Sequence, residues 1–571
     1  MLDNAVGMVF NPGSNLKGQV AGANWSFLLP DMNLERILCY GKPSLRAQET
    51  LNHLSREVLI ITEESNLPLF QPQDQDHSVG LTHRDPQANS IPASLSNGTF
   101  DLLLLIGRKI IRKFHSNLVL QSDLIRQLSP HGLIYLELDG LFEQLLTQKE
   151  AKQLATNLGK SYFLWSSPFR GDIRAAIPAD DQITINYFIR HGLYQSESKT
   201  NLLAQARRFI CKPFIQNKSI QRQIIFISHD NNIEMGLPPE YLRTLASQAG
   251  INIHQYRWGL AAHGEYSTRK VLFYLFKSDN ETPEYIVKLV RNSAYNSRLE
   301  NEYHALSTLW SKGVGALNFL PKPVFFGYHN ELAILGETAI AGKSFRKMTG
   351  NHPDCPNARL AVQHLIELGV VIPDAYSTTP CKAAETLNRL FESFIRIYKP
   401  NTEVQTFLEK QIVSIASYEG TFPLVFQHGD PGTWNILVTS KGEVFFLDWE
   451  SAEPNGVPLW DLFYFLRSYA VGFARKAGIR DAVRGFEQHF LMDNQFSHFT
   501  IEALHDYCQR LKLPVVLVEP LFYTCWMHRS LKEANRLGQN QLHKSHYFNL
   551  LVSCIQKRDT LQMSRLFSAG Y

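Results

Sequence analysis

The sequence contains no long apolar run, few cysteines and almost no excess of either charge. The strongest candidate for a membrane span, Leu102 to Ile106, falls far short of the ~18 apolar residues that a bilayer requires, so we expect no transmembrane segment. The seven cysteines are scattered, odd in number and never spaced Cys-x-x-Cys, which argues against a disulfide framework and a zinc site. The net charge of +4 does not indicate a nucleic-acid partner.

The first residues, Met1 to Val6, lack the basic segment and apolar core of a signal peptide, and together with the unpatterned cysteines this predicts a cytoplasmic protein. What is present is an ordinary globular composition, with 44% apolar and 19% charged residues. A chain of 571 residues is too long for one typical core, so we expect two or three domains.

The most informative segment runs from Phe426 through Glu450 and carries an Asp-x-x-x-x-Asn spacing, Asp430 to Asn435, followed by Asp448. Two apolar runs around Ser440-Lys441-Gly442 predict a β-hairpin between Asn435 and Asp448. The hairpin should fold Asp448 back beside Asn435. One aspartate that orients a hydroxyl, with an amide and a carboxylate that hold Mg²⁺ on nucleotide phosphates, is typical of phosphoryl transfer.

Upstream segments supply the rest of such a site. Lys288 interrupts the apolar strand Tyr285 to Val290, where a kinase places the lysine that pairs with the α- and β-phosphates. Apolar residues at near-helical spacing predict a helix over residues 299–310, and its Glu302 is the candidate partner of Lys288, with Glu300 as the alternative.

The nucleotide-covering turn is expected between two strands, over residues 261–267. It lacks the Gly-x-Gly-x-x-Gly pattern of protein kinases, so phosphate contacts should come from Gly264 and from backbone or hydroxyl groups. Strands over residues 323–328 and 332–335 complete a five-stranded lobe, and residues 336–342 are expected to form the hinge that holds adenine.

The pattern His428-Gly429-Asp430-x-x-x-x-Asn435, the later Asp448 and the segment Pro458 to Leu462 resemble the aminoglycoside phosphotransferase and choline kinase families. This resemblance implies an α+β bilobal protein-kinase-like domain, with an N-lobe over residues 251–340 and a C-lobe over residues 341–571. It also implies ATP and Mg²⁺ as cofactors. The implied roles are catalytic for Asp430, cofactor-binding for Lys288, Glu302 and Gly264, and metal-binding for Asn435 and Asp448.

Residues 1–195 alternate strand-like and helix-like patterns, which predicts an α/β Rossmann-like domain, and residues 196–250 form a connector. The order of segments resembles class I S-adenosylmethionine-dependent methyltransferases. The turn at Gly41-Lys42-Pro43-Ser44 has one glycine where that family has Gly-x-Gly, so we expect a degenerate domain that serves binding or docking. An intact methyltransferase, with Glu63 at the ribose-binding strand end, and an unrelated α/β domain are the alternatives.

Four other features have competing interpretations. His428 is expected to fix backbone geometry rather than act as a base. Asp461 either holds the catalytic loop or caps the helix that follows it. Trp434 either lines the acceptor site or packs under the hairpin. The basic cluster Arg475 to Arg480 is either a solvated helix end or a contact for an anionic partner.

The sequence thus predicts an ATP- and Mg²⁺-dependent phosphotransferase that acts on a hydroxyl of a small molecule. Residues 341–571 hold 24 Lys and Arg against 22 Asp and Glu, which does not suit a polycationic acceptor such as an aminoglycoside. A pseudokinase-like binding protein and a bifunctional methyltransferase-kinase are the alternatives. The acceptor, the choice between ATP and GTP and the oligomeric state stay open.

Overall fold

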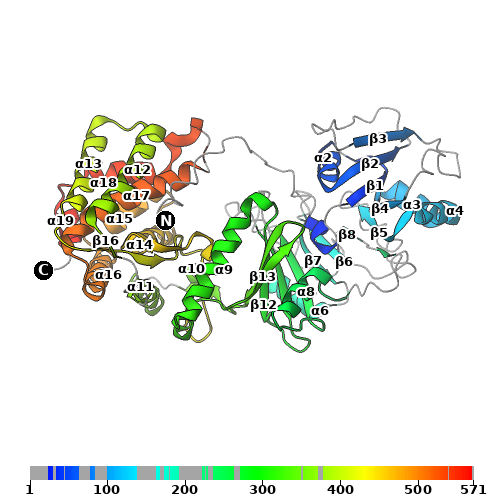
Figure 1. Ribbon diagram of the computed structural model, residues 1–571, viewed down its shortest axis with the longest axis horizontal. Helices are drawn as coiled ribbons and strands as arrows, with labels where there is room; N and C mark the ends of the chain where they lie inside the picture. The colour runs from blue at the N-terminus through cyan, green and yellow to red at the C-terminus, as the bar shows by residue number, and fades with distance from the viewer. Residues whose placement is uncertain are drawn as a thin grey trace. The chain divides into compact units, whose positions relative to one another are not determined.

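The computed structural model describes residues 24–29, 34–43, 45–62, 78–83, 99–137, 162–166, 173–178, 181–191, 222–224, 227–228, 236–262, 270–348, 352–370, 377–535, 537 and 539–568. These residues form two compact units (Figure 1). The sheet unit comprises the described parts of residues 16–299 and 323–339, and the helical unit those of residues 300–322 and 340–571. The chain thus passes from one unit to the other beside residue 340, within the predicted hinge.

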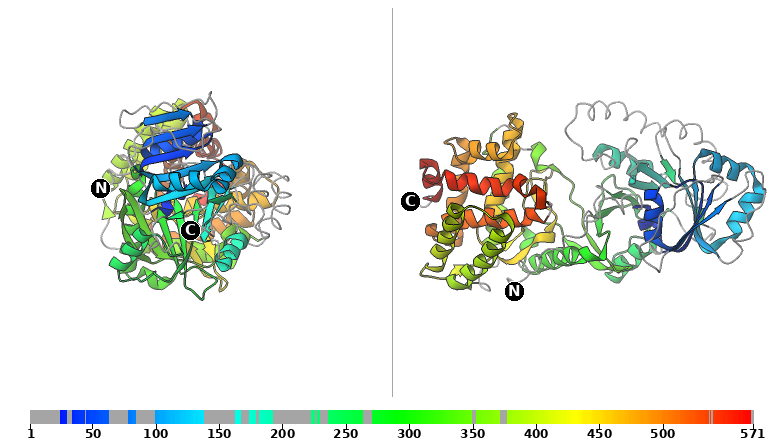
Figure 2. Two further views of the ribbon diagram at one scale, coloured as in Figure 1. Left: turned by 90° about the vertical axis from the view of Figure 1, so that its right-hand side faces the viewer. Right: turned by 90° about the horizontal axis from the view of Figure 1, so that it is seen from above.

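The first sheet of the sheet unit has the order β3-β2-β1-β4-β5-β9, with β1 to β5 parallel and β9 antiparallel. Strands β1 to β5 are labelled in Figure 1, and Figure 2 shows them in blue and cyan from two further sides. Its strands are β1 (Leu34–Tyr40), β2 (Ser55–Thr62), β3 (Ser78–His83), β4 (Phe100–Ile106), β5 (Leu128–Glu137) and β9 (Ile227–Ser228). The connecting helices are α2 (Leu45–Leu54), α3 (Arg108–Ser116) and α4 (Leu118–Arg126).

Burial explains why these strands read as continuous apolar runs. In β4, Leu102 and Leu104 enter one hydrophobic cluster, whereas Leu103 and Leu105 enter another, so both faces are covered. Parallel sheets need such double coverage. The predicted Rossmann-like α/β fold is confirmed.

The strand order reverses between β1 and β4, where ligands of such folds bind. Gly41 follows β1 with φ +132°, and a Cβ there would lie 2.5 Å from the backbone oxygen of Ile106, the last residue of β4. The turn therefore approaches β4 so closely that only glycine fits.

The second sheet has the order β13-β14-β12-β11-β10-β7-β6-β8 and is antiparallel. The strands are β6 (Tyr162–Ser166), β7 (Ile173–Pro178), β8 (Arg222–Ile224), β10 (Arg257–Ala262), β11 (Val271–Phe276), β12 (Tyr285–Leu289), β13 (Pro323–His329) and β14 (Leu332–Thr338). Helices α6 (Gln182–His191) and α8 (Glu240–Gln248) belong to the same unit.

Five of these strands, β10 to β14, form the predicted kinase-like N-lobe. The other three extend its sheet across the predicted domain boundaries at residues 195 and 250, because β7 pairs with β10 through Ala176↔Leu260 and Ala175↔Ala261. One hydrophobic cluster contains residues of both sheets, including Ile37 of the first and Trp258 of the second. The two sheets therefore share a core.

The helical unit is the predicted C-lobe together with most of α9. Its helices are α9 (Asn296–Ser311, from residue 300), α10 (Phe345–Met348), α11 (Pro356–Val370), α12 (Pro380–Tyr398), α13 (Thr402–Ala416), α14 (Trp460–Lys476), α15 (Ala482–Phe490), α16 (Gln495–Leu511), α17 (Val518–Ala534), α18 (His546–Gln556) and α19 (Leu561–Phe567). Its short strands are β15 (Lys343–Ser344), β16 (Ser377–Thr378), β17 (Phe422–Pro423), β18 (Val425–Gln427), β19 (Ile436–Val438), β20 (Val444–Phe446) and β21 (Glu453–Gly456).

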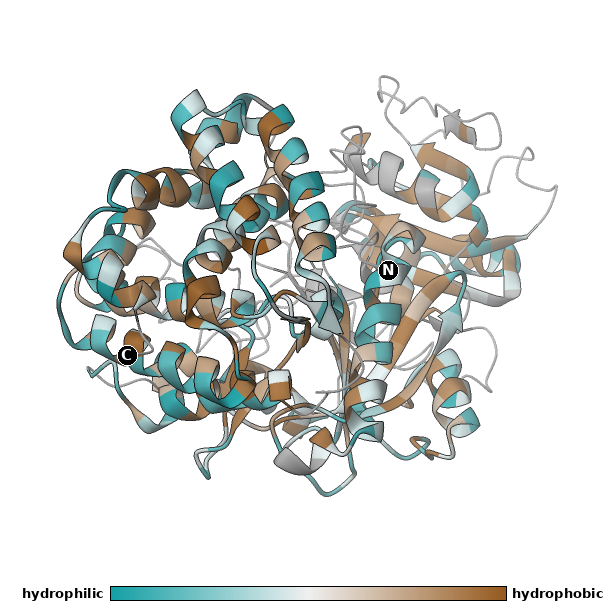
Figure 3. Cartoon of the chain, turned by 60° about the vertical axis from the view of Figure 1, so that its left-hand side comes forward, coloured by the Kyte–Doolittle hydropathy of each residue, from teal (hydrophilic) through white to brown (hydrophobic). Residues whose placement is uncertain are grey.

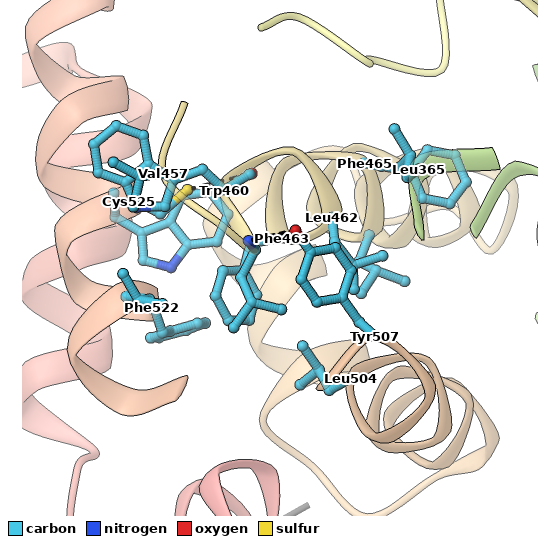
Figure 4. Packing of buried hydrophobic residues seen from close by; sticks show 14 of the residues in the cluster. Leu365, Val457, Trp460, Leu462, Phe463, Phe465, Leu504, Tyr507, Phe522 and Cys525 are labelled. Carbon is cyan, nitrogen blue, oxygen red and sulfur yellow. Dashed lines mark hydrogen bonds between the residues drawn. The ribbon is translucent and has the colours of Figure 1, made fainter. Parts of the chain in front are cut away.

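Most of these helices have one hydrophilic and one hydrophobic face (Figure 3). Helix α14 is buried on nearly all sides in its first three turns and forms the centre of the core. Its Phe463 packs edge-to-face on Phe522 of α17, and the Cys525 thiol donates to the backbone oxygen of Trp460 (Figure 4).

Among the described residues, no helix combines the length and apolarity needed to cross a membrane. The six cysteines that the structure describes are all free thiols.

Candidate active site

The predicted catalytic loop follows β18, and its conformation requires glycine at position 429. Gly429 has φ +77°, and a Cβ at this position would lie 1.8 Å from the backbone oxygen of Ser451. The loop thus packs directly against the segment that follows Asp448. The predicted β-hairpin is present as β19 and β20, whose Ile436, Val438, Val444 and Phe446 are buried in the helical unit's core.

His428 fixes this loop, as its position predicted. Its Nε2 lies 3.0 Å from the backbone oxygen of Leu447, and the backbone N–H of Asp430 donates to its Nδ1 at 3.2 Å. This pattern requires a neutral ring with the proton on Nε2. Burial lowers the pKa of His428, although neighbouring carboxylates oppose the shift, so the neutral form is favoured.

Asp461 was expected either to hold the loop or to cap a helix, and its contacts show that it holds the loop. Its carboxylate accepts the backbone N–H of His428 at 2.6 Å and that of Gly429 at 3.2 Å. Helix α14 begins beside it without a side-chain cap. Asp461 is therefore a positioning residue for the loop rather than a helix cap.

Asp430 and Asn435 meet within the loop. The Asn435 Nδ2 donates to the backbone oxygen of Asp430 at 3.0 Å and to its Oδ2 at 3.2 Å. The backbone oxygen of Asn435 accepts the N–H of Leu447 at 2.8 Å, so the hairpin returns the chain to Asn435 one residue before Asp448. Asp448 has a left-handed backbone conformation, φ +68°, which is rare outside glycine and occurs at sites under functional constraint.

Glu302 is buried on α9 and accepts the backbone N–H of Trp449 at 3.1 Å. The adjacent Asn301 donates through its side chain to the backbone oxygens of Glu450 and Ala452. Helix α9 therefore anchors the segment that begins at Asp448. Glu300 is only partly buried, whereas Glu302 is fully buried.

Lys288 lies on β12 and forms an ion pair with Glu337 of β14, with Nζ 2.8 Å from Oε1. Both side chains are at least nine-tenths buried. Lys288 and Glu302 belong to different compact units, and their pairing stays a prediction. Glu337 was not predicted as a site residue, because the hinge was expected to begin at residue 336, whereas β14 continues to Thr338. The available signal was an acidic side chain directly after an apolar run. Gly264 lies outside the described residues.

Trp434 does not pack under the hairpin, because 43% of its surface is exposed. Its ring meets Tyr464 of α14 edge-to-face, with centroids 6.0 Å apart, and the guanidinium of Arg346 lies 5.4 Å from its centroid. An exposed aromatic ring between Asp430 and Asn435 in the sequence is suited to contact a ligand.

Arg529 is a second residue beside the loop that was not predicted from the sequence. This buried side chain lies 3.8 Å from Asp461 and stacks on the ring of Tyr464. Burial lowers the pKa of Arg529, but Tyr464 and the carboxylates of Asp430 and Asp461 more than offset this effect, so the pKa is raised. The permanent positive charge of Arg529 thus stabilises the carboxylates of Asp430 and Asp461.

Comparison with known proteins gives one sequence family and several similar structures. Residues 265–492 match the model of the phosphotransferase enzyme family. No curated protein matches the sequence.

Three solved structures illustrate the structural similarity. The aminoglycoside phosphotransferase APH(3'')-Id from Streptomyces rimosus is 14% identical, with 49% of this chain and 97% of that chain covered and a TM-score of 0.30. The choline kinase LicA from Streptococcus pneumoniae is 15% identical, with 49% and 89% covered and a TM-score of 0.26. WbdD, solved with a kinase inhibitor, is 12% identical, with 99% of each chain covered and a TM-score of 0.24.

The family match includes every residue of the loop and hairpin described above, from His428 to Asp461, and also Lys288 and Glu302. Residues 265–492 of this chain are therefore similar to the phosphotransferase enzyme family.

Proposed function

We propose that the protein transfers the γ-phosphoryl group of ATP to a hydroxyl of a small molecule. The observation that carries this proposal is the hydrogen-bonded pair of Asp430 and Asn435, with Asp448 at the end of the hairpin that returns to them. Phosphoryl transfer depends mainly on positioning and charge neutralisation, and these three side chains supply both.

In the proposed reaction, the acceptor oxygen forms a bond to the γ-phosphorus while the bond between that phosphorus and the β,γ-bridging oxygen breaks, and ADP leaves. Asp430 orients the acceptor hydroxyl and takes its proton, which then passes to solvent. The hydrogen bond from Asn435 holds the Asp430 carboxylate in place. Lys288, fixed by Glu337, is the proposed contact for the α- and β-phosphates.

The residues present suit Mg²⁺. Asn435 uses its Nδ2 as a donor, and its Oδ1 accepts no hydrogen bond from any residue that the structure describes. Amide and carboxylate oxygens are the ligands that Mg²⁺ prefers, alongside substrate phosphates. Asn435 and Asp448 would hold the ion, which supplies neutralisation of phosphate charge when bound.

Two substitutions test this proposal. Asp448→Ala should abolish measurable transfer with the fold intact, because the nucleotide charge is no longer neutralised. Asp430→Asn should lower kcat at least about 100-fold with nucleotide affinity nearly unchanged. Asp506→Asn, an exposed position on α16, is the matched control.

The readout is acceptor-dependent ADP release during an unbiased metabolite screen, with ATP affinity measured separately by titration calorimetry. Unchanged turnover of the Asp448 variant at saturating Mg²⁺ would remove that residue from the site. A loss of ATP affinity in the Asp430 variant equal to its loss of turnover would make Asp430 structural. ATP binding without turnover on any acceptor would support the pseudokinase alternative.

The sheet order β3-β2-β1-β4-β5 keeps methyl transfer open as a second activity, because its switch point is where a cofactor binds in doubly wound folds. The turn Gly41-Lys42-Pro43-Ser44 has one glycine, and its lysine and proline would obstruct close approach of the backbone to a cofactor, so we predict weak or absent S-adenosylmethionine binding. Calorimetry on the full chain decides this. A low-micromolar dissociation constant that is lost in Glu63→Ala would establish the bifunctional enzyme; Glu63 itself lies outside the described residues.

We also propose that the protein works in a reducing compartment such as the cytoplasm. The free state of the six described cysteines supports this proposal.

A further inference from the structure

A small basic pocket lies in the helical unit beside the catalytic loop. It has a volume of about 230 Å³ and is lined by Arg346, Gly472, Arg475 and Lys476. Arg346 comes from α10, whereas the other three residues come from the last turns of α14. Side chains from two separate helices thus direct positive charge toward one space.

The pocket is connected to the catalytic loop through direct contacts. The Arg346 Nε donates to the Thr433 Oγ1 at 3.1 Å, and Thr433 lies between Asp430 and Asn435 in the sequence. The Thr433 backbone N–H donates to the Ser468 Oγ of α14 at 3.0 Å. Gly472 follows Ser468 on the same helix face, about 6 Å further along the axis. The pocket therefore begins one helical turn beyond Ser468, which contacts the loop through Thr433.

Two guanidinium groups, those of Arg346 and Arg475, line this pocket. Arg346 is only partly exposed, and its Nε donates to a neutral hydroxyl, that of Thr433. In the part of the chain that the structure describes, no carboxylate forms an ion pair with Arg346 or Arg475. Burial lowers the pKa of Arg346, and the charge of Arg475 lowers it further. Repulsion between these two guanidinium groups is a cost that a bound anion would remove.

The position of Arg475 and Lys476 at the C-terminus of α14 has an ordinary explanation, because basic residues there stabilise the helix dipole. That explanation does not account for Arg346. Arg346 comes from another helix, contacts the catalytic loop and lines the same pocket. A ligand site explains all of these residues together.

We propose that this pocket binds a phosphate group of the acceptor, so that the physiological acceptor is a phosphorylated hydroxyl compound such as a sugar phosphate. A guanidinium binds phosphate through two parallel hydrogen bonds, and a doubly charged group matches a pocket lined by three basic residues. Trp434, half exposed and next to Arg346, would contact the apolar face of the same molecule. A polycationic acceptor would be repelled.

This inference rests on the proposed function, but its first test measures binding alone. The full chain, saturated with ADP and Mg²⁺ to fill the nucleotide site, is titrated with glucose 6-phosphate, glycerol 3-phosphate, their neutral parents and inorganic phosphate. Trp434 fluorescence and calorimetry report binding. We expect at least one phosphate ester to bind at least tenfold more tightly than its neutral parent and than inorganic phosphate.

Variants assign the binding to the pocket. Arg475→Ala should weaken the phosphate ester at least tenfold, and Arg475→Lys should restore part of the affinity. Arg480→Ala is the matched control, because Arg480 is an exposed member of the same basic cluster that does not line the pocket. Arg346→Ala should weaken binding and also lower kcat through Thr433.

Three outcomes would overturn the inference. One is no preference for any phosphate ester over its neutral parent. Another is equal weakening by Arg475→Ala and Arg480→Ala. The third is inorganic phosphate binding as tightly as the esters, which means an adventitious ion only.

A transfer assay on the same compounds separates this inference from the proposed function. Tight ester binding that depends on Arg475, without phosphate transfer to any acceptor, would leave the pocket in place and reject the kinase. Efficient transfer to neutral acceptors that Arg475→Ala does not alter would leave the kinase in place and reject the pocket.

Discussion

Asp430 occupies a loop whose shape is fixed by hydrogen bonds between side chains and backbone groups. His428 contributes both ring nitrogens to this loop, and Asp461 accepts two of its N–H groups. Gly429 permits the close packing on Ser451. Such preorganisation matters for phosphoryl transfer, because a displacement of about 1 Å can lower the rate about 100-fold.

Two glycines with similar backbone angles allow a matched test of this packing. Gly429 and Gly442 have φ +77° and +82°, but only Gly429 has neighbours within 4 Å of the missing Cβ. Gly442→Ala should cost about 1–2 kcal/mol of stability with normal turnover, because its only unfavourable effect is an alanine in the left-handed backbone conformation. Gly429→Ala must also displace Ser451, so it should lower kcat at least about 100-fold. Thermal unfolding and steady-state kinetics check both, and equal effects of the two variants would contradict the packing argument.

At the scale of the elements, the register of two strands decides where Lys288 finds a carboxylate. Lys288 pairs with Leu335 across β12 and β14, and Glu337 lies two residues further along β14 on the same face. The neighbours Val287 and Leu289 point to the opposite face, into the hydrophobic core. The sheet thus separates the buried ion pair from the core.

Substitutions in this ion pair should separate stability from nucleotide binding. Lys288→Met leaves Glu337 buried without this cation and should cost about 3–5 kcal/mol. Lys288→Met combined with Glu337→Met replaces both charges by apolar groups and should recover much of that stability. Neither variant should bind ATP tightly. Urea unfolding and ATP titration measure the two properties, and full ATP affinity in the double variant would exclude Lys288 as the phosphate contact.

At the scale of the whole molecule, the two sheets of the sheet unit depend on each other. Strand β7 covers the edge of β10, and the shared cluster includes residues from both sheets. An uncovered edge strand and an exposed apolar face promote aggregation. Neither the Rossmann-like part nor the kinase-like part is therefore expected to fold well alone.

Truncation tests this dependence. A chain of residues 251–571 should be aggregated or should unfold at least about 4 °C below the full chain, because β10 loses its neighbour and cluster residues such as Leu260 are exposed. Size-exclusion chromatography and circular dichroism provide the readout. A soluble monomeric fragment with the full chain's unfolding temperature and its ATP turnover would show that the shared core is dispensable.

The helical unit should lose stability on mild acidification. Four of its histidines are buried with a lowered pKa, and burial is the largest cause for each: His364, His428, His489 and His528. For His528, the charges of Lys532 and Arg529 lower the pKa further. A histidine that is neutral in the folded state binds fewer protons than in the unfolded state, so its stabilisation is present above pH 6.5 and lost as the pH falls below it.

The expected slope between pH 6.5 and 5.5 is up to about 1.4 kcal/mol per pH unit for each histidine that stays neutral. Chemical unfolding at several pH values measures it. His528→Phe, which keeps an aromatic ring on Trp460, should reduce the slope by one histidine's share. A stability that is constant over this range would contradict the prediction.

Features that depend on neighbouring residues could be predicted from the sequence. The hairpin between Asn435 and Asp448 is local, so its alternating apolar residues and its turn predicted it, and with it the position of Asp448. The strands of the Rossmann-like sheet could be predicted from their apolar runs, which arise because both faces of a parallel sheet are buried. The similarity of residues 265–492 to the phosphotransferase family was predictable from the spacing of Asp430, Asn435 and Asp448.

The tertiary structure decided the contacts between residues that are distant in sequence. The pairing of Lys288 with Glu337 depends on the register of β12 and β14, and the role of Asp461 depends on how α14 meets the loop. The pairing of β7 with β10 and the meeting of Arg346 with Arg475 are equally non-local. No local pattern encodes such contacts, because each is selected only when whole helices and strands pack and bury their apolar faces together.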